Sequence, residues 1–404
     1  MRISRWWPGT LLVLLLPLAC RGEPRSAMTA ERLGELVDSL QSAVEAAVGL
    51  PFTDPVHSEL TTTEAVQAYL LDRLMRDFPP ERMEGVQGAY RLLGLLPDSL
   101  DLEKLLLDLY SEQVAGYYDP ERETLYAIET ANPSQLRLIM AHEMVHALQD
   151  QYLPLDSLMV LGGNSDVVAA TQAVLEGHAT VASIRVLTPT DDVVSTAGFW
   201  ETYRQQVRAQ QRQMAIFASA PLVLREALIF PYLEGAAFMQ WWSENRSTPL
   251  PGPEELPVSS EQVLHPVRYV GGDVPVVLVF QDSSSEVLHE DTLGELEIQI
   301  LLASMRGADE ATYDQPIGWG GDRYRVYRSP DGVALIWYSV WEGAPQADRA
   351  YRHLREGFAP PPVDYRAVVE RLTIDGQEGV LVMRAPGSWA GWVARPKVSV
   401  REDP

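Results

Sequence analysis

Two histidines four residues apart, with a glutamate directly after the first, form the segment His142-Glu143-Met144-Val145-His146. On a helix this spacing places both imidazoles on one face, one turn apart, where a single zinc ion can bind both. Zinc lowers the pKa of bound water and polarises a substrate carbonyl, and an adjacent carboxylate can take the proton from that water. The segment therefore predicts Zn²⁺ as cofactor and Glu143 as the general base of a hydrolytic reaction.

A catalytic zinc site needs a third protein ligand, which must come from another part of the chain. The segment Leu175-Glu176-Gly177-His178-Ala179 offers two candidates, Glu176 and His178. These residues are two positions apart and cannot share one helical face, so only one of them can face the imidazole pair. The small residues at 177 and 179 suit close packing of the helix that carries them.

A hydrolytic site also needs side chains that orient the ligands and stabilise the negative charge of the transition state. Asp150, one turn beyond His146, could orient an imidazole or could be a solvated carboxylate at the helix end. For the oxyanion, His265 is the favoured donor because it lies in a proline-rich segment that could project into a cleft. Tyr269 and Tyr232 are the alternatives, and Tyr232 could instead have only a packing role.

Helical spacing of apolar residues dominates the first 250 residues. Before the histidine pair we expect helices over residues 29–50, 63–76, 80–93 and 100–114, then a turn at 117–120 and a strand at 124–128. The pair itself lies in a helix predicted over residues 135–151. Further helices are expected over residues 169–187, 200–217 and 222–242. A short strand would thus lead directly into the helix that carries both histidines.

The pattern changes near residue 250. Three prolines interrupt the helical spacing and predict a loop or linker, which we assign to residues 251–270. Beyond it, strands are expected at 274–280, 324–328, 333–340 and 379–384, and helices at 293–305 and 346–358. The glycine cluster at 318–324 lacks the flanking elements of a phosphate-binding loop and predicts a turn, and the tryptophans of this region are expected in the core. The fold class is therefore α+β, mainly helical over residues 29–250, with a C-terminal α+β region at 271–404.

The histidine pair followed by a glutamate on a later helix resembles the gluzincins, the thermolysin-like zincin metallopeptidases. The resemblance covers about residues 112–179. It is closer to a group of little-characterised bacterial lipoproteins and secreted proteins, which share phrases such as Ala115-Gly116-Tyr117-Tyr118-Asp119-Pro120. It implies a zincin-like core, Glu176 as the third zinc ligand, and hydrolysis of peptide bonds. Compared with thermolysin, the gap between His146 and Glu176 is longer and the asparagine that usually precedes the glutamate is missing.

The N-terminus has the charged, apolar and small-residue regions of a secretory signal peptide. Its apolar stretch, residues 11–18, is too short to span a bilayer. Cys20, the only cysteine, follows this stretch in a pattern that resembles the lipobox of bacterial lipoproteins, in which this cysteine is acylated. The resemblance implies a signal peptide over 1–20, a tether over 21–28 and a lipid anchor in the cell envelope, at the outer membrane of a double-membraned cell. An ordinary cleaved signal is the alternative.

The formal net charge of -24, from 56 acidic and 32 basic residues, argues against nucleic acid as a partner. We expect a peptide or protein substrate, and contact with the membrane through the N-terminal anchor. One alternative is a non-catalytic zinc-binding envelope lipoprotein that acts as a binding or scaffolding module. The intact Glu143 argues against it, because a structural zinc site needs no general base. A zinc hydrolase of a non-peptide substrate, such as a cell-wall fragment, is a second alternative.

Overall fold

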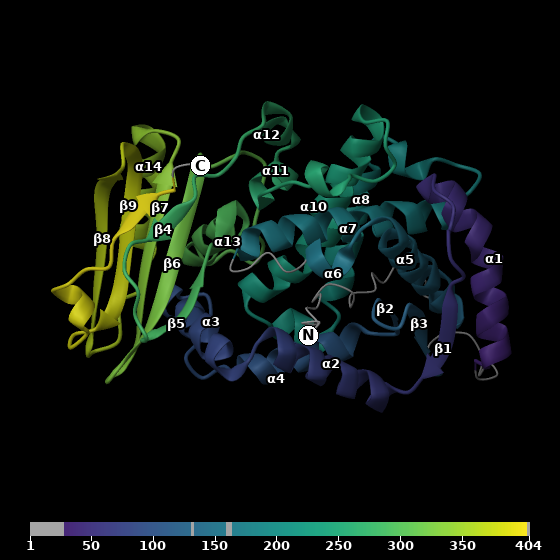
Figure 1. Ribbon diagram of the computed structural model, residues 1–404, viewed down its shortest axis with the longest axis horizontal. Coiled ribbons are helices and arrows are strands. Elements are labelled where there is room, and N and C mark those ends of the chain that lie inside the picture. The colour runs from purple at the N-terminus through teal and green to yellow at the C-terminus, as the bar shows by residue number, and fades with distance from the viewer. Residues whose placement is uncertain (1–27, 131–132, 159–163, 402–404) are drawn as a thin grey trace.

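A computed structural model describes residues 28–130, 133–158 and 164–401. Helices fill one half of the molecule and an antiparallel sheet forms the other half (Figure 1). The predicted α+β fold is confirmed. Cys20, the predicted signal peptide and residues 21–27 of the predicted tether lie outside the described residues. Within the described ranges, no helix is both long enough and apolar enough to cross a membrane.

In the part of the chain that the structure describes, four helices precede the helix of the histidine pair, as the apolar spacing predicts. They are α1 (Ala30–Val48), α2 (Thr63–Asp77), α3 (Pro80–Leu93) and α4 (Leu102–Gln113). The hydroxyl of Thr62 caps α2 by accepting from the N–H of Ala65 at 3.2 Å. Gly49 ends α1 with a φ of 82°, a conformation that only glycine adopts without strain.

A three-stranded sheet supports the histidine helix. Its order is β1-β3-β2, with β1 (His57–Thr61) parallel to β3 (Thr124–Ile128) and β2 (Gly116–Asp119) antiparallel to β3. The turn predicted at 117–120 is therefore wrong for residues 117–119, which belong to β2. Tyr117 and Tyr118 are buried opposite Tyr126 and Leu125, and this cross-strand packing outweighs the local turn signal.

Three long helices form the centre of the helical half. They are α5 (Pro133–Tyr152), α7 (Ser165–Leu187) and α10 (Leu222–Asn245), and α10 continues through Pro231. Shorter helices connect them: α6 (Leu155–Leu158), α8 (Phe199–Gln211) and α9 (Ala215–Ser219). The single helix predicted over 200–217 is thus two helices. The predicted loop at 251–270 contains the single turn η2 (Pro253–Glu255) and two short helices, α11 (Ser260–Leu264) and α12 (Pro266–Gly271).

The C-terminal half contains a five-stranded antiparallel sheet of order β5-β6-β7-β9-β8. Its strands are β5 (Val287–Asp291), β6 (Trp319–Ser329), β7 (Gly332–Trp341), β8 (Tyr365–Ile374) and β9 (Gln377–Pro386). A smaller pair joins β4 (Leu278–Phe280) to β10 (Val398–Val400). The helices of this half are α13 (Gly294–Met305) and α14 (Ala344–Gly357).

The glycine cluster at 318–324 belongs largely to β6, so the turn predicted there is wrong. The buried carboxylate of Asp322 ties this part of β6 to α13. It accepts from the N–H groups of Leu293 and Gly294, each at 3.0 Å, at the start of that helix. It also accepts from the indole N–H groups of Trp319 and Trp337 at 3.1 and 3.0 Å. These tryptophans are buried, as the sequence predicts, and one carboxylate fixes them to the helix.

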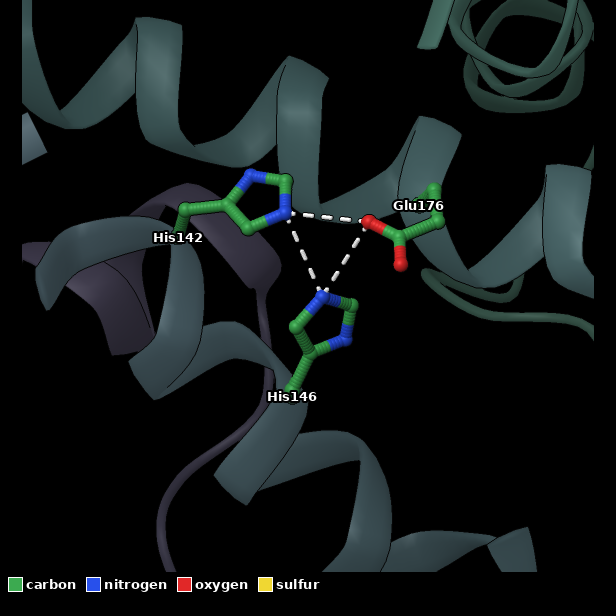
Figure 2. A group of neighbouring side chains, drawn as sticks. All are labelled: His142, His146 and Glu176. Atoms are coloured by element: carbon green, nitrogen blue, oxygen red, sulfur yellow. Dashed lines mark hydrogen bonds and ion pairs between the residues drawn. The ribbon is translucent and has the colours of Figure 1, made fainter. Parts of the chain in front are cut away.

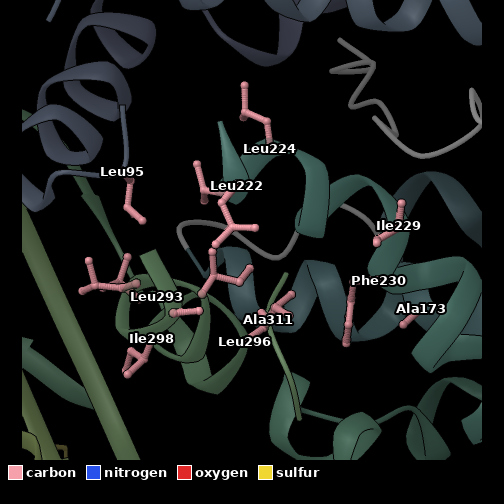
Figure 3. Close-up of a cluster of buried hydrophobic side chains, with 14 of the residues drawn as sticks. Leu95, Ala173, Leu222, Leu224, Ile229, Phe230, Leu293, Leu296, Ile298 and Ala311 are labelled. Carbon is pink, nitrogen blue, oxygen red and sulfur yellow. The ribbon is translucent and has the colours of Figure 1, made fainter. Parts of the chain in front are cut away.

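One hydrophobic core joins the helices to the sheet. Figure 3 shows Leu222 of α10, Leu296 of α13 and Leu95, which follows α3, gathered in the same interior region. The same cluster includes Val326 of β6 and Trp337 of β7. The C-terminal region therefore shares its core with the helical half.

Candidate metal centre

Helices α5 and α7 bring together the three side chains that the sequence selects as metal ligands. His142 and His146 extend from successive turns of α5, and Glu176 extends from α7 towards both (Figure 2). Helix α5 is held in place because apolar residues surround it, packing against α1, α7 and the small sheet. Because the two histidines are four residues apart, their imidazoles lie on the same face of α5, and this face is directed at α7.

The three facing atoms form a nearly equilateral triangle. The Nε2 atom of His142 lies 3.1 Å from Oε2 of Glu176, and Nε2 of His146 lies 3.3 Å from the same oxygen. The two Nε2 atoms are 3.2 Å apart. A tetrahedral zinc ion with bonds of about 2.0–2.1 Å separates its ligand atoms by about 3.3 Å. The donor set and its spacing therefore fit a zinc ion.

Glu176 gives a second indication of a cation. Its side chain is fully buried, and its other oxygen, Oε1, has no hydrogen-bond partner among the described residues. A buried carboxylate oxygen without a partner is unfavourable, and a bound cation would compensate it.

The buried carboxylate of Glu143 lies on the strand side of the pair. Its Oε2 accepts from the backbone N–H of Tyr118, on β2, at 2.9 Å. Burial raises the pKa of Glu143 to about 8, since the charged form loses solvation. The hydroxyl of Tyr118 donates to Asp150 at 2.9 Å, so Asp150 ties β2 to α5.

Gln149, which the sequence reasoning missed, orients His146. Its Oε1 accepts from Nδ1 of His146 at 2.9 Å, which leaves the lone pair of Nε2 directed at the other two ligands. Its Nε2 donates to the carbonyl of Leu175 at 2.9 Å and to Nδ1 of His178 at 3.0 Å. A glutamine three residues after the second histidine lies on the same helical face, and this spacing could have indicated its role.

His178, the rival third ligand, faces Gln149 and not the triangle. Burial lowers its pKa to about 3, so it is neutral and accepts the hydrogen bond from the Gln149 amide. Of the two candidates on α7, the structure therefore brings Glu176 to the imidazole pair. The assignment of Glu176 as a metal ligand stays a prediction.

The three side chains also affect one another's protonation. Burial opposes the charge on Glu176, but its contacts with His146 and His142 hold its pKa below the usual value. The carboxylate in turn raises the pKa of His146 to about 9, against the opposing effect of burial. Burial lowers the pKa of His142. A proton and a cation therefore compete for Nε2 of His146.

Only one of the three predicted oxyanion donors lies at the triangle. The ring of Tyr232, on α10, stacks beside that of His142 with centroids 6.1 Å apart. His265 instead places Nε2 3.2 Å from Oε1 of Glu295, and the Tyr269 hydroxyl donates to the carbonyl of Glu255 at 2.7 Å.

The short helices that carry His265 and Tyr269 dock away from the triangle. Ser260 of α11 donates through its N–H to Asp166 at 3.1 Å, at the start of α7. Ten residues of helix separate Asp166 from Glu176, which is about 15 Å. The structure therefore does not bring His265 or Tyr269 to the metal ligands.

Two glycines let α7 and α10 cross in close contact beside Glu176. A Cβ atom added to Gly177 would lie 2.1 Å from the carbonyl carbon of Gly235. One added to Gly235 would lie 2.1 Å from the carbonyl oxygen of Ala173. Both contacts are with backbone atoms, so a side chain at either position would force the helices apart.

Replacing Gly177 with alanine is therefore expected to lower the free energy of unfolding by about 1–3 kcal/mol, as overpacking does, and to weaken zinc binding through the displaced Glu176. Gly34→Ala is the control: Gly34 lies within α1 with nothing within 4 Å of an added Cβ, so this change should stabilise by up to about 1 kcal/mol. Denaturant unfolding measures the free energy of unfolding of both variants. Equal changes in this free energy would contradict the close crossing of α7 and α10.

The family model that matches this chain covers the C-terminal sheet. A family model described as a domain of unknown function, DUF8575, matches residues 285–402, which include β5 to β10 but none of the triangle residues. No curated protein sequence matches this chain. One solved structure, a hydrolase candidate with a novel fold from Chloroflexus aurantiacus, is 18% identical over 60% of this chain and 89% of its own, with a TM-score of 0.38. This likeness is too low to bear on the fold or the site.

Proposed function

We propose that this protein is a zinc-dependent metallopeptidase of the HExxH type that hydrolyses peptide bonds at the cell envelope. The observation that carries the proposal is the triangle of His142, His146 and Glu176, whose facing atoms lie 3.1–3.3 Å apart. Glu143 directly follows His142 in the sequence. A purely structural zinc site would need a fourth protein ligand, whereas a catalytic site has three. In the described residues, the group of potential ligands at this point has three members.

The proposed reaction divides between the cofactor and the protein. Zinc, when bound by the triangle, would supply the Lewis acid that lowers the pKa of water and polarises the substrate carbonyl. Glu143 would take the proton of the attacking water on its carboxylate and pass it to the leaving amine, so that it is regenerated. Tyr232 is the proposed donor to the oxyanion, because it alone of the three candidates lies beside a ligand.

The strand beside Glu143 positions the proposed base. In the sheet order β1-β3-β2, β2 is the end strand, and its Tyr118 N–H contacts the carboxylate of Glu143. Export and anchoring through Cys20 remain part of the proposal.

The test is digestion of a peptide library with and without a zinc chelator. We expect cleavage by the zinc-loaded protein, loss of cleavage when the chelator removes the metal, and recovery when zinc is returned. Mass spectrometry identifies new termini, and metal analysis of the same samples gives the zinc content. Zinc binding without cleavage would favour the non-catalytic lipoprotein. Cleavage of cell-wall fragments alone would favour a non-peptide hydrolase.

A further inference from the structure

A cleft of about 990 Å³ lies at the joint between α3 and the C-terminal sheet. One wall consists of α3 and the chain that follows it as far as Asp98. The other wall consists of the start of β7, Tyr365 of β8, Arg384 of β9 and the loop at 359–362. The volume is within the range of sites that bind small molecules. None of the proposed metal ligands lines this cleft, so it is separate from the metal centre.

Arg384 is a buried cation in the wall of this cleft, and no carboxylate among the described residues forms an ion pair with it. Its side chain is 6% exposed, although arginine is rarely buried without an ion pair. Its Nη2 donates to the carbonyl of Ala359 at 3.0 Å, and its guanidinium carbon lies 4.9 Å from the centre of the Phe358 ring. Its Nε is buried and has no hydrogen-bond partner within the described part of the chain. Burial lowers the pKa of Arg384.

A second arginine lines the same cleft from the helical side. Arg91, on α3, donates through Nη2 to the carbonyl of Leu100 at 2.8 Å and lines the cleft. Two guanidinium groups from different halves of the molecule thus line one cleft. Guanidinium groups bind carboxylates through paired, charge-assisted hydrogen bonds, so a carboxylate in the cleft would have two cations to bind.

The rest of the lining selects a singly charged ligand with an apolar body. Leu92, Leu96, Val333 and the prolines of the loop at 359–362 provide apolar surface. Two carboxylates, Glu84 and Asp98, also line the cleft, and Glu84 is paired with Arg328 at 2.8 Å. These carboxylates and the net charge of -24 disfavour a doubly charged phosphate more than a carboxylate.

We propose that this cleft binds the carboxylate of an apolar molecule, with Arg384 and Arg91 as its anion-binding residues. Two sources share this chemistry: a free fatty acid, and the C-terminal carboxylate of an apolar peptide. The proposal does not depend on the metal centre or on peptidase activity.

Calorimetric titration of the full chain tests the proposal with two pairs of probes. The first pair is decanoate and decanamide, and the second is acetyl-trileucine with a free carboxylate and its amide. At least one carboxylate should bind about tenfold more tightly than its amide, which corresponds to one charge-assisted interaction. The pair that shows this preference identifies the source of the ligand. Absence of binding by both carboxylates, or equal binding of acid and amide, would overturn the proposal.

Three variants assign the preference to the two arginines. Arg384→Met and Arg91→Gln should each remove the preference for the carboxylate, whereas Arg306→Gln, at an exposed position outside the lining, should keep it. Without ligand, Arg384→Met should leave the melting temperature unchanged or raise it, because it removes a buried cation that has no counter-charge. A large fall in melting temperature would mean that Arg384 has a structural role. Should that variant fail to fold, Arg91→Gln and the comparison of acid with amide probes still test whether the cleft binds a carboxylate.

Discussion

Replacing Glu143 with glutamine is expected to abolish peptide hydrolysis while leaving about one zinc ion bound per chain. Glutamine has the same shape, and its amide oxygen can still accept from the Tyr118 N–H, now 2.9 Å from Oε2. It cannot take a proton from water, so kcat should fall by about 10²–10⁴. Peptide cleavage rates and zinc content, measured on the same preparation, check this result.

The control for this change is Glu129→Gln, because Glu129 is an exposed glutamate outside the metal centre. It should retain both zinc and activity. If Glu143→Gln kept the rate of the unaltered protein, Glu143 would have no role as base and the proposed reaction would lose its proton acceptor. If the change removed zinc as well, the loss of activity could be assigned to the metal instead.

Replacing Glu176 with glutamine is expected to weaken zinc binding by at least about a hundredfold, since a ligand matters more than the groups that merely orient ligands. The change removes the charge from an oxygen that lies 3.1 Å and 3.3 Å from the two imidazole nitrogens. It also preserves the volume at a fully buried position. Competition with a chromophoric chelator measures the affinity.

His178→Gln is the matched comparison on the same helix. His178 contacts Gln149 and not the triangle, so its loss should change zinc affinity by no more than about tenfold. The reverse order, with the larger loss at position 178, would show that the wrong residue of α7 has been assigned to the metal. The comparison therefore tests the ligand set independently of catalysis.

Local patterns predicted most of the helices and the common face of the histidine pair. The spacing of apolar residues located α3 and α7. The four-residue spacing of His142 and His146 fixes their relative position on any helix, so their common face follows from the sequence alone. Such features depend on residues that are close together in the chain.

Features that depend on distant parts of the chain were missed. Strand β1 pairs with β3 across more than sixty residues, and its own sequence contains little apolar alternation. His265 was favoured because it lies among prolines, but docking of Ser260 on Asp166 decides where that segment lies. The hydrogen bonds of Gln149 to both α5 and α7 likewise depend on how the two helices cross.

The family domain matched at residues 285–402 is shorter than the structural unit that it forms here. Strand β4, which precedes the match, pairs with β10, and α3 approaches β5 so closely that a Cβ added to Gly85 would lie 2.3 Å from the Cβ of His289. A gene fragment limited to the match would encode an unpaired edge and an uncovered apolar face, both of which promote aggregation. A protein limited to the matched segment would therefore have to pair β10 and cover this face of the sheet by other means, such as self-association.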